Sequence, residues 1–412
     1  MNYVIIGNSA AAIGCIEGIR KIDGEGSITL ISSENHHTYS RPLISYLLYG
    51  KTDEERMKYR PDSFYSDNKV KTLLGRTVTS IDSEKRTVTV DGKDKIKYDK
   101  LLVATGSRPF VPPMDGLENV KNKFSFMTLD DAKALEKALS PESRVLIVGA
   151  GLIGLKCAEG INHLVKKLTV IDLAPRILPR NLDEKGSSMI QKHMEKSGVE
   201  FFLGTSVKHF DENKAQLTNG KTVEFDVLVL AVGVRPNTEL VAEAGGKVNK
   251  GICINQFCQT SLSNVYAAGD CTESHDITDG QDRVLALLPN AYMQGETAGM
   301  HMAGAEKPYD KAIPMNAGGF FGLHIITSGL VETGDCDEYV SESNGNYKKL
   351  IYKDNLLKGY MLVGDVSRAG IYTKLIREQI PLDTIDFELI KEKPQLMAFS
   401  RADRAEQLGG VR

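Results

Sequence analysis

The sequence contains few cysteines, and their placement excludes several kinds of site. Its 412 residues hold six cysteines, none in a Cys-x-x-Cys pair, at positions 15, 157, 253, 258, 271 and 336. Structural zinc sites and iron–sulfur clusters need closely spaced thiolates. We therefore predict no metal site and no cluster on this chain. A disulfide framework is equally unexpected in a reducing compartment.

Blocks of like charge and long apolar runs are also missing. Lys and Arg number 51 against 54 Asp and Glu, for a formal charge of −3, which argues against nucleic acid as the main partner. No stretch approaches the roughly 18–20 apolar residues that span a bilayer. The first residues lack the basic and apolar regions of a signal peptide. We therefore expect no membrane association and a cytoplasmic location.

Two stretches of the sequence match one another at an offset of 127 residues. Residues 98–109 read YDKLLVATGSRP and residues 225–236 read FDVLVLAVGVRP. Each copy consists of an aromatic residue and Asp, an apolar strand, a glycine and Arg-Pro. A strand and a small-residue turn precede each copy, at residues 4–12 and 145–154. The chain therefore contains two consecutive βαβ units of the dinucleotide-binding type.

The pattern changes after about residue 250, and residues ~312–392 form a third region. Tyr347–Asp365 has the alternation of a β-hairpin that turns at Asp354-Asn355. Residues 369–379 have the pattern of a helix. The last 20 residues, from Lys393, are mixed and polar, and no structure is assigned to them.

The second glycine turn has the features of an NAD site. Gly149, Gly151 and Gly154 follow an apolar strand and open a helix, and Asp172 lies at the end of the next strand, directly after residues 168–171. Glycines permit a tight turn and close approach to a pyrophosphate, while the helix N-terminus offers free N–H groups. An acid at this distance can hydrogen-bond a ribose 2′-OH and repels a 2′-phosphate. The pattern therefore favours NADH over NADPH.

The first turn departs from this pattern. It begins with Gly7 but has Ser9 and Ala12 at the second and third glycine positions. These small side chains keep the backbone accessible to a nucleotide. Glu34, shortly after the strand at residues 27–31, supplies a carboxylate for the ribose.

Two later segments supply further candidate contacts. Gly269-Asp270 ends a short strand that begins at Val265, and its carboxylate can accept a hydrogen bond from a polyhydroxyl chain such as ribityl. Pro289-Asn290 begins a predicted helix over residues 289–303, with proline in its first turn. The N-terminus of this helix would stabilise negative charge on a flavin ring.

Together these motifs resemble the FAD-dependent pyridine nucleotide–disulfide oxidoreductase superfamily. Within it the chain is most similar to NADH:rubredoxin reductases, ferredoxin reductases of oxygenase systems and the flavin portion of assimilatory nitrite reductases. The motifs are Tyr39-Ser-Arg-Pro42, Ala104–Pro109, Gly149–Gly154, Ala231–Asn237, Tyr266–Asp270 and Pro289-Asn290-Ala291.

The resemblance implies an α/β fold with two Rossmann-like dinucleotide-binding domains, for FAD and NAD, of the three-layer ββα type. A C-terminal α+β domain follows. The FAD-binding domain would be discontinuous, over residues 1–113 and 244–311. The NAD-binding domain would cover 114–243, and the C-terminal domain, with its polar tail, 312–412.

The resemblance also assigns cofactor-binding residues. FAD would contact Gly7, Ser9, Ala10, Ala12, Glu34, Arg41, Pro42, Ala104, Thr105, Gly106, Arg108, Gly269, Asp270, Pro289 and Asn290. NADH would contact Gly149, Gly151, Ile153, Gly154, Asp172 and Gly233. Arg41 would be a cation for the FAD pyrophosphate, and Pro42 a rigid residue in the wall beside the flavin.

Two departures from the relatives bear on the chemistry. Many relatives carry a reactive cysteine in the segment that here reads HTYSRPLISYLL, and this chain has none between Cys15 and Cys157. Many also place a glutamate near the flavin and nicotinamide where this chain has Lys156, the one candidate catalytic residue. Lys156 could pair with another acid or stabilise flavin charge. Alternatively it points elsewhere, and Glu159 takes the acidic role.

These features predict an FAD enzyme that oxidises NADH and passes electrons to a small iron–sulfur carrier protein of the ferredoxin or rubredoxin type. Direct reduction of O2 is the enzymatic alternative. Disulfide and peroxide chemistry are disfavoured, because both depend on the missing thiol. A third alternative is a flavin-bearing subunit of a larger electron-transfer assembly with little turnover alone. A homodimer is also compatible with the resemblance.

Overall fold

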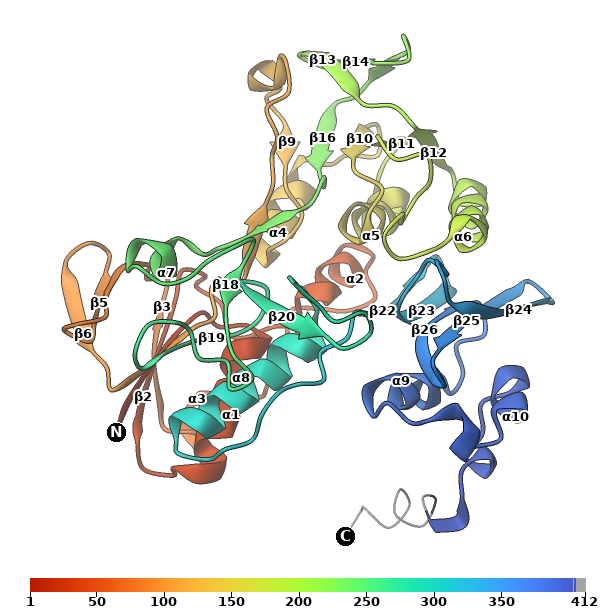
Figure 1. The fold of residues 1–412 in the computed structure, drawn as a ribbon. Coiled ribbons are helices and arrows are strands. Elements are labelled where there is room, and N and C mark those ends of the chain that lie inside the picture. The colour runs from red at the N-terminus through yellow and green to blue at the C-terminus, as the bar shows by residue number, and fades with distance from the viewer. Residues whose placement is uncertain (403, 405–412) are drawn as a thin grey trace.

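The structure is a computed structural model that describes residues 1–402 and 404. Figure 1 shows two nucleotide-binding-type units, here called the FAD unit and the NAD unit, and a C-terminal domain, drawn in blue, that lies beside both. Within the described residues, no helix has the length and apolar character needed to cross a membrane.

The FAD unit is built around a five-stranded parallel sheet with the order β19-β7-β1-β2-β3. Its strands are β1 (Asn2–Ile6), β2 (Ser27–Ser32), β3 (Val70–Leu74), β7 (Lys100–Val103) and β19 (Val265–Ala267). An antiparallel sheet of β4 (Val78–Asp82), β5 (Thr87–Val90) and β6 (Asp94–Lys97) forms a second layer. The main helices are α1 (Ala10–Ile22) and α8 (Leu288–Met302), with short α2 (Ile44–Leu48), α3 (Phe64–Asp67) and α7 (Glu239–Glu243).

The NAD unit repeats this plan. Its parallel sheet has the order β12-β11-β10-β16-β9, made of β9 (Lys123–Phe124), β10 (Arg144–Val148), β11 (Lys167–Asp172), β12 (Val199–Leu203) and β16 (Val227–Leu230). Its antiparallel layer is β13 (Val207–Asp211), β14 (Lys214–Leu217) and β15 (Thr222–Glu224), and its helices are α4 (Leu129–Ala138), α5 (Leu152–Ile161) and α6 (Glu184–Lys196). The fold class predicted from the sequence is confirmed, and the duplication seen in the sequence is a duplication of structure.

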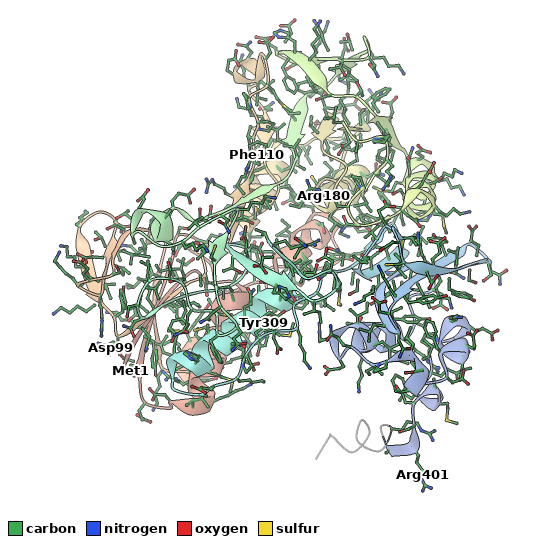
Figure 2. The ribbon with its side chains drawn as sticks, in the orientation of Figure 1. Met1, Asp99, Phe110, Arg180, Tyr309 and Arg401 are labelled. Atoms are coloured by element: carbon green, nitrogen blue, oxygen red, sulfur yellow. The ribbon has the colours of Figure 1, made fainter. Side chains whose placement is uncertain are left out.

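The two copies of the repeated Arg-Pro motif pair with one another. β8 (Ser107–Pro109) leads the chain toward the NAD unit and β17 (Val234–Pro236) leads it back, and the two are antiparallel neighbours. Arg108 stands opposite Arg235 in this ladder. The guanidinium of Arg235 covers the ring of Phe110 at 4.4 Å, and Phe110 lies at the junction of the two units (Figure 2).

Helices α1 and α8 pack closely because glycines face the opposite backbone. A Cβ placed on Gly14 would lie 2.2 Å from the carbonyl oxygen of Tyr292, and one on Gly295 would lie 1.9 Å from that of Ala11. No side chain fits at either position. The contact holds the start of α1, and with it the first turn, against the helix predicted to face the flavin.

The C-terminal domain is a five-stranded antiparallel sheet with helices on one side. Its strands run in the order β22-β23-β26-β25-β24: β22 (Met315–Phe320), β23 (Leu323–Gly329), β24 (Asp337–Ser343), β25 (Asn346–Lys353) and β26 (Leu356–Val363). The helices are α9 (Ala369–Arg377) and α10 (Phe387–Glu392). Between β18 (Ile252–Cys253) and α8 lies a small hairpin, β20 (Thr272–Asp276) and β21 (Gln281–Arg283).

Part of the predicted polar tail, which begins at Lys393, is buried in the core. Ala398 and Phe399 are buried in the C-terminal core against α9 and α10 residues. Residues 403 and 405–412, which complete the predicted polar tail, lie outside the described residues.

Candidate cofactor sites

A cavity of about 320 Å³ opens at the first turn, between the carboxyl ends of the FAD-unit strands. The predicted FAD residues that line it come from four segments of the chain: Gly7, Ser9, Ala10, Glu34, Arg41, Ala104, Thr105, Gly106, Gly269 and Asp270. Gly7 has φ +112°, and a Cβ there would lie 2.1 Å from the carbonyl oxygen of Ala104. The tight turn therefore requires glycine at this position.

The other predicted FAD residues lie outside the lining of this cavity. Ala12 is buried within α1, and Pro42 and Pro289 are exposed. Arg108 pairs with Glu239 at 2.6 Å. Asn290 is buried, and its side chain donates to the carbonyl of Ile313 and accepts from the hydroxyl of Tyr309. Tyr309 lies on the segment that follows α8 (Figure 2), so the amide of Asn290 braces the start of the C-terminal domain.

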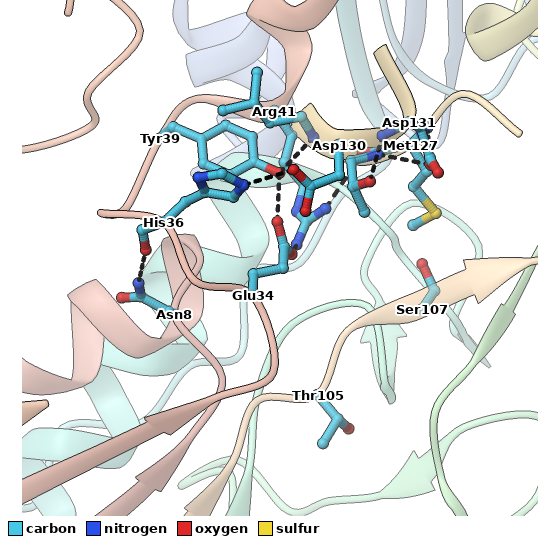
Figure 3. A network of polar contacts seen from close by, with 12 residues as sticks. Asn8, Glu34, His36, Tyr39, Arg41, Thr105, Ser107, Met127, Asp130 and Asp131 are labelled. Carbon is cyan, nitrogen blue, oxygen red and sulfur yellow. Dashed lines mark hydrogen bonds and ion pairs between the residues drawn. The ribbon is translucent and has the colours of Figure 1, made fainter. Parts of the chain in front are cut away.

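A polar network fixes the acid of the first unit (Figure 3). Glu34 forms an ion pair with Arg41 and accepts from the hydroxyl of Tyr39 at 2.7 Å. Arg41 also donates to the carbonyl of Met127 at 3.2 Å, and Tyr39 accepts from the backbone N–H of Leu129 at 3.0 Å. The predicted ribose-binding acid and pyrophosphate-binding cation are therefore neighbours, oriented by Met127 and by Leu129, the first residue of α4.

Asp270 lines the same cavity. Its carboxylate accepts from the hydroxyl of Ser107 at 3.4 Å, a long hydrogen bond that leaves acceptor capacity free. Removal from water raises the pKa of the Asp270 carboxyl, and Ser107 and Arg41 oppose this rise. This free capacity suits the predicted contact with a polyhydroxyl chain.

The second turn repeats the geometry of the first. Gly149 has φ +119°, and a Cβ there would lie 2.2 Å from the carbonyl oxygen of Ala231. Gly151 is the N-cap of α5, Ile153 and Gly154 lie in its first turn, and Gly233 is an exposed glycine between β16 and β17. Asp172, the last residue of β11, accepts from the backbone N–H of Ala150 at 2.6 Å and of Ala174 at 2.8 Å.

The starts of the helices fit nucleotide ligands. Helices α1, α5 and α8 follow the segments predicted to face cofactors, and none of them has a side-chain cap. Helices α2, α3, α7 and α9 also lack a side-chain cap, whereas α4, α6 and α10 are capped by Thr128, Asp183 and Asp386. Uncapped N–H groups at a helix start are the donors that bind phosphate. The ring nitrogen Nε2 of His37, beside the acid of the first unit, is also buried without a protein partner.

Lys156 pairs with another acid, one of the alternatives that the sequence left open. Its ammonium forms an ion pair with Glu159 and donates to the carbonyl of Gly319 at 3.1 Å. It also lies 4.3 Å from the centre of the Tyr46 ring. The role of Lys156 in chemistry stays a prediction.

Several lining residues of the first cavity were not predicted. Asn237 accepts and donates hydrogen bonds with Thr105, through its backbone carbonyl at 2.7 Å and its side-chain amide at 2.8 Å. Ser107, Arg76 and Met127 also line the cavity. The signal for Asn237 was present, because it directly follows the second Arg-Pro, whereas Arg76 and Met127 follow no motif.

The cysteines stand apart from the cavity lining. In the described residues, the lining of the first cavity includes no cysteine. Cys271 directly follows Asp270, but its thiol is fully buried against the carbonyls of Val103 and Ala268. Burial raises the pKa of Cys271 to about 11. A protonated, enclosed thiol is a poor nucleophile.

Two ββα units, each with a glycine turn and a nearby acid, define a two-dinucleotide oxidoreductase. The chain belongs to the pyridine nucleotide-disulphide oxidoreductase family, whose profile matches residues 1–295. The rubredoxin NAD+ reductase C-terminal domain matches residues 314–380. FAD and NAD(H) are the cofactors of this family and of this chain.

Three similar proteins place the chain more closely. It is 31% identical to a nitrite reductase [NAD(P)H] of Bacillus subtilis, over 91% of this chain and 47% of that protein, so it spans about half the length of this relative. It is 31% identical to the epsilon subunit of an NADH-dependent phenylglyoxylate dehydrogenase of Aromatoleum evansii, over 92% of both chains. The ferredoxin reductase for the CYP199A2 system of Rhodopseudomonas palustris superposes with a TM-score of 0.84 at 25% identity, over 93% of this chain and 96% of that one.

Proposed function

We propose that the chain oxidises NADH at its FAD and passes the electrons to a small iron–sulfur carrier protein of the ferredoxin or rubredoxin type. The observation that favours this acceptor is the segment Ser40-Arg41-Pro42 beside the FAD cavity, where Arg41 is paired with Glu34. This segment carries no thiol that could receive electrons. Cys271, which follows the lining residue Asp270, is buried, and burial raises the pKa of its thiol to about 11. The acceptor is therefore outside this chain.

FAD accepts a hydride from NADH and can release electrons singly, so it links a two-electron donor to one-electron carriers. The protein's part is to hold both nucleotides. The FAD unit would hold FAD along the cavity, with Glu34 at the ribose and Asp270 at the ribityl chain. The NAD unit would hold NADH on the turn Gly149–Gly154, with Asp172 selecting against a 2′-phosphate.

Anaerobic stopped-flow spectroscopy tests this proposal. NADH is expected to bleach the flavin, and subsequent mixing with ferredoxin or rubredoxin is expected to restore its absorbance faster than mixing with O2. Rapid reoxidation by O2 together with indifference to both carriers would identify an oxidase and reject the proposal. Bleaching by NADPH but not by NADH would reject the role given to Asp172.

A second candidate, a subunit of a larger redox complex, is favoured by the full-length similarity to a dehydrogenase epsilon subunit. Affinity purification of the tagged chain from its native cells tests it, with partners identified by mass spectrometry. Because Ala398 and Phe399 are core residues, a truncation that tests the tail should begin after Arg404 rather than at Lys393. The predicted homodimer stays a prediction, which light scattering of the purified chain would test.

A further inference from the structure

The hairpin between β22 and β23 of the C-terminal domain is held by the helix that follows the NAD turn. Lys156 lies in the second turn of α5, and its ammonium donates to the carbonyl of Gly319 at 3.1 Å. Glu159 is 4% exposed and pairs with Lys156 through one carboxylate oxygen. Its other oxygen accepts from the backbone N–H of Phe321 at 2.9 Å. The pair thus binds Gly319, in β22, and Phe321, the first residue of the turn.

Phe321 itself has an unusual backbone. Its φ is +50°, a region that a side chain such as phenylalanine rarely adopts without support. Its carbonyl lies 3.0 Å from the ring nitrogen Nε2 of His193, on α6. Both backbone polar groups of this residue are therefore bound by side chains of the NAD unit, which holds the hairpin in one conformation.

The same pair reaches the FAD unit. The ammonium of Lys156 lies over the Tyr46 ring at 4.3 Å and over the Phe320 ring at 5.8 Å. Tyr46 belongs to α2, which begins three residues after Arg41. Helices α2 and α5 are in contact, since a Cβ on Gly160 would lie 2.9 Å from the carbonyl oxygen of Ser45. One partly buried ammonium therefore contacts residues of all three parts of the molecule.

We propose that Lys156 and Glu159 are positioning residues that set how the NAD unit meets the FAD unit, by fastening α5 both to α2 and to the 319–321 hairpin. This inference rests on the proposed function, because it assigns the pair to the alignment of NADH with the flavin. Hydride transfer depends steeply on the separation and orientation of the two rings. The pair is therefore expected to control the rate of transfer rather than the affinity for either nucleotide.

The test measures how fast NADH reduces the bound flavin of Lys156→Met and Glu159→Gln, using anaerobic stopped-flow spectroscopy. We expect the limiting rate to fall at least ~10-fold while the Kd for NADH changes less than ~3-fold, since a misplacement of about 1 Å can cost 10²-fold in rate. The flavin content should be unchanged, and Lys156→Arg should recover most of the rate. Lys185→Met is the matched control. It breaks an exposed ion pair between Lys185 and Glu342, which joins the NAD unit to the C-terminal domain at another place.

Limiting rates within threefold of wild type in both variants, or a loss confined to NADH affinity, would overturn the inference. A second readout does not depend on turnover. In Glu159→Leu the backbone N–H of Phe321 loses its acceptor, so peptides covering residues 317–325 should exchange hydrogen faster than in wild type and in Lys185→Met. Unchanged exchange would overturn the inference. If NADH fails to reduce even the wild-type flavin, the proposed function fails, while the exchange experiment still tests the fastening of the hairpin.

Discussion

The FAD unit and the NAD unit share one backbone plan but hold their acids differently. In each, the turn glycine donates to the end of the second strand, Gly7 to Ile31 and Gly149 to Ile171, at 2.8 Å. Glu34 is held by the side chains of Arg41 and Tyr39. Asp172 is held by backbone N–H groups of its own unit. The duplicated fold thus repeats the glycine turn, while each unit holds its predicted ribose-binding acid with a different kind of partner.

The second difference concerns enclosure. Segments from the NAD unit and its approaches, including Met127 and Asn237, close the cavity of the FAD unit. Such enclosure suits a cofactor that stays bound through many turnovers, whereas NADH has to enter and leave in every cycle. If the first turn holds FAD and the second holds NADH, as proposed, the same turn serves a resident cofactor in one unit and a passing substrate in the other.

The sharpest way to break the comparison is to block each turn separately. Gly7→Ala places a Cβ 2.1 Å from a carbonyl oxygen, and Gly149→Ala one 2.2 Å away. We expect Gly7→Ala to purify without flavin. Gly149→Ala should keep its flavin but be reduced by NADH at least ~100-fold more slowly. Visible absorbance per protein and stopped-flow reduction measure the two effects, and loss of flavin in both variants would contradict the assignment of the units.

A smaller effect is expected from the two acids. Asp172→Ala removes the acceptor of two backbone N–H groups and the proposed contact with the ribose. We expect the Kd for NADH to rise about 10- to 30-fold, equivalent to roughly 1.4–2 kcal/mol, and the preference over NADPH to narrow. Glu34→Ala should weaken FAD retention and leave the Kd for NADH unchanged. Titrations of both variants with NADH and NADPH measure the two Kd values. If Asp172→Ala and Glu34→Ala raised the Kd for NADH equally, the assignment of Asp172 to NADH and of Glu34 to FAD would be wrong.

Asp270 follows β19 of the FAD unit and should make the free energy of unfolding depend on pH. In the NAD unit the corresponding strand β9 is followed by Ser125 and Phe126. Removal from water raises the pKa of the Asp270 carboxyl, so the folded, FAD-free protein binds its proton more tightly than the unfolded chain. The stabilisation is complete below the unfolded pKa of about 3.9 and is lost as pH rises through the folded pKa. Asp270→Asn should lack this loss.

Urea unfolding of the FAD-free protein at several pH values checks this prediction. The free energy of unfolding of wild type should fall relative to that of Asp270→Asn as pH rises from about 4, with a slope of at most one proton. Parallel curves for the two proteins would show that the carboxyl titrates alike in the folded and unfolded states.

The smallest effect is expected from Ala12→Gly, which gives the first turn the third glycine that the second turn has. Ala12 is fully buried in α1, at the place that Gly154 takes in α5. Ala12→Gly should lower the free energy of unfolding by about 1 kcal/mol and leave the flavin bound. Chemical denaturation with flavin fluorescence measures both quantities. Loss of the flavin would mean that the methyl group of Ala12 is itself a contact.

Local patterns predicted most of the framework. The hairpin turn at Asp354-Asn355 is confirmed, and both residues have positive φ, 51° and 62°, as a two-residue hairpin loop requires. The helix predicted at 289–303 is α8, Leu288–Met302, and the one at 369–379 is α9, Ala369–Arg377. These elements were accessible because their signals lie within a few residues of one another.

The contacts that cross the chain were not accessible in this way. The predicted contact of Asn290 with FAD stays a prediction, and its amide binds the carbonyl of Ile313 and the hydroxyl of Tyr309. No pattern specifies the direction in which a side chain points at a helix start. The carbonyl of Gly319, which Lys156 binds, and the backbone N–H of Phe321, which Glu159 binds, both lie more than 160 residues downstream of these side chains. Only the folded chain brings these groups together.

Because β8 and β17 are hydrogen-bonded neighbours, the chain leaves the FAD unit and returns to it at one place. The NAD unit is therefore an insertion, here called a cassette, whose two ends are adjacent, with Pro109 opposite Val234. A cassette of this kind can be exchanged for the equivalent segment of a relative through two cuts in one ladder. Its nucleotide preference could then be replaced without re-routing the surrounding chain.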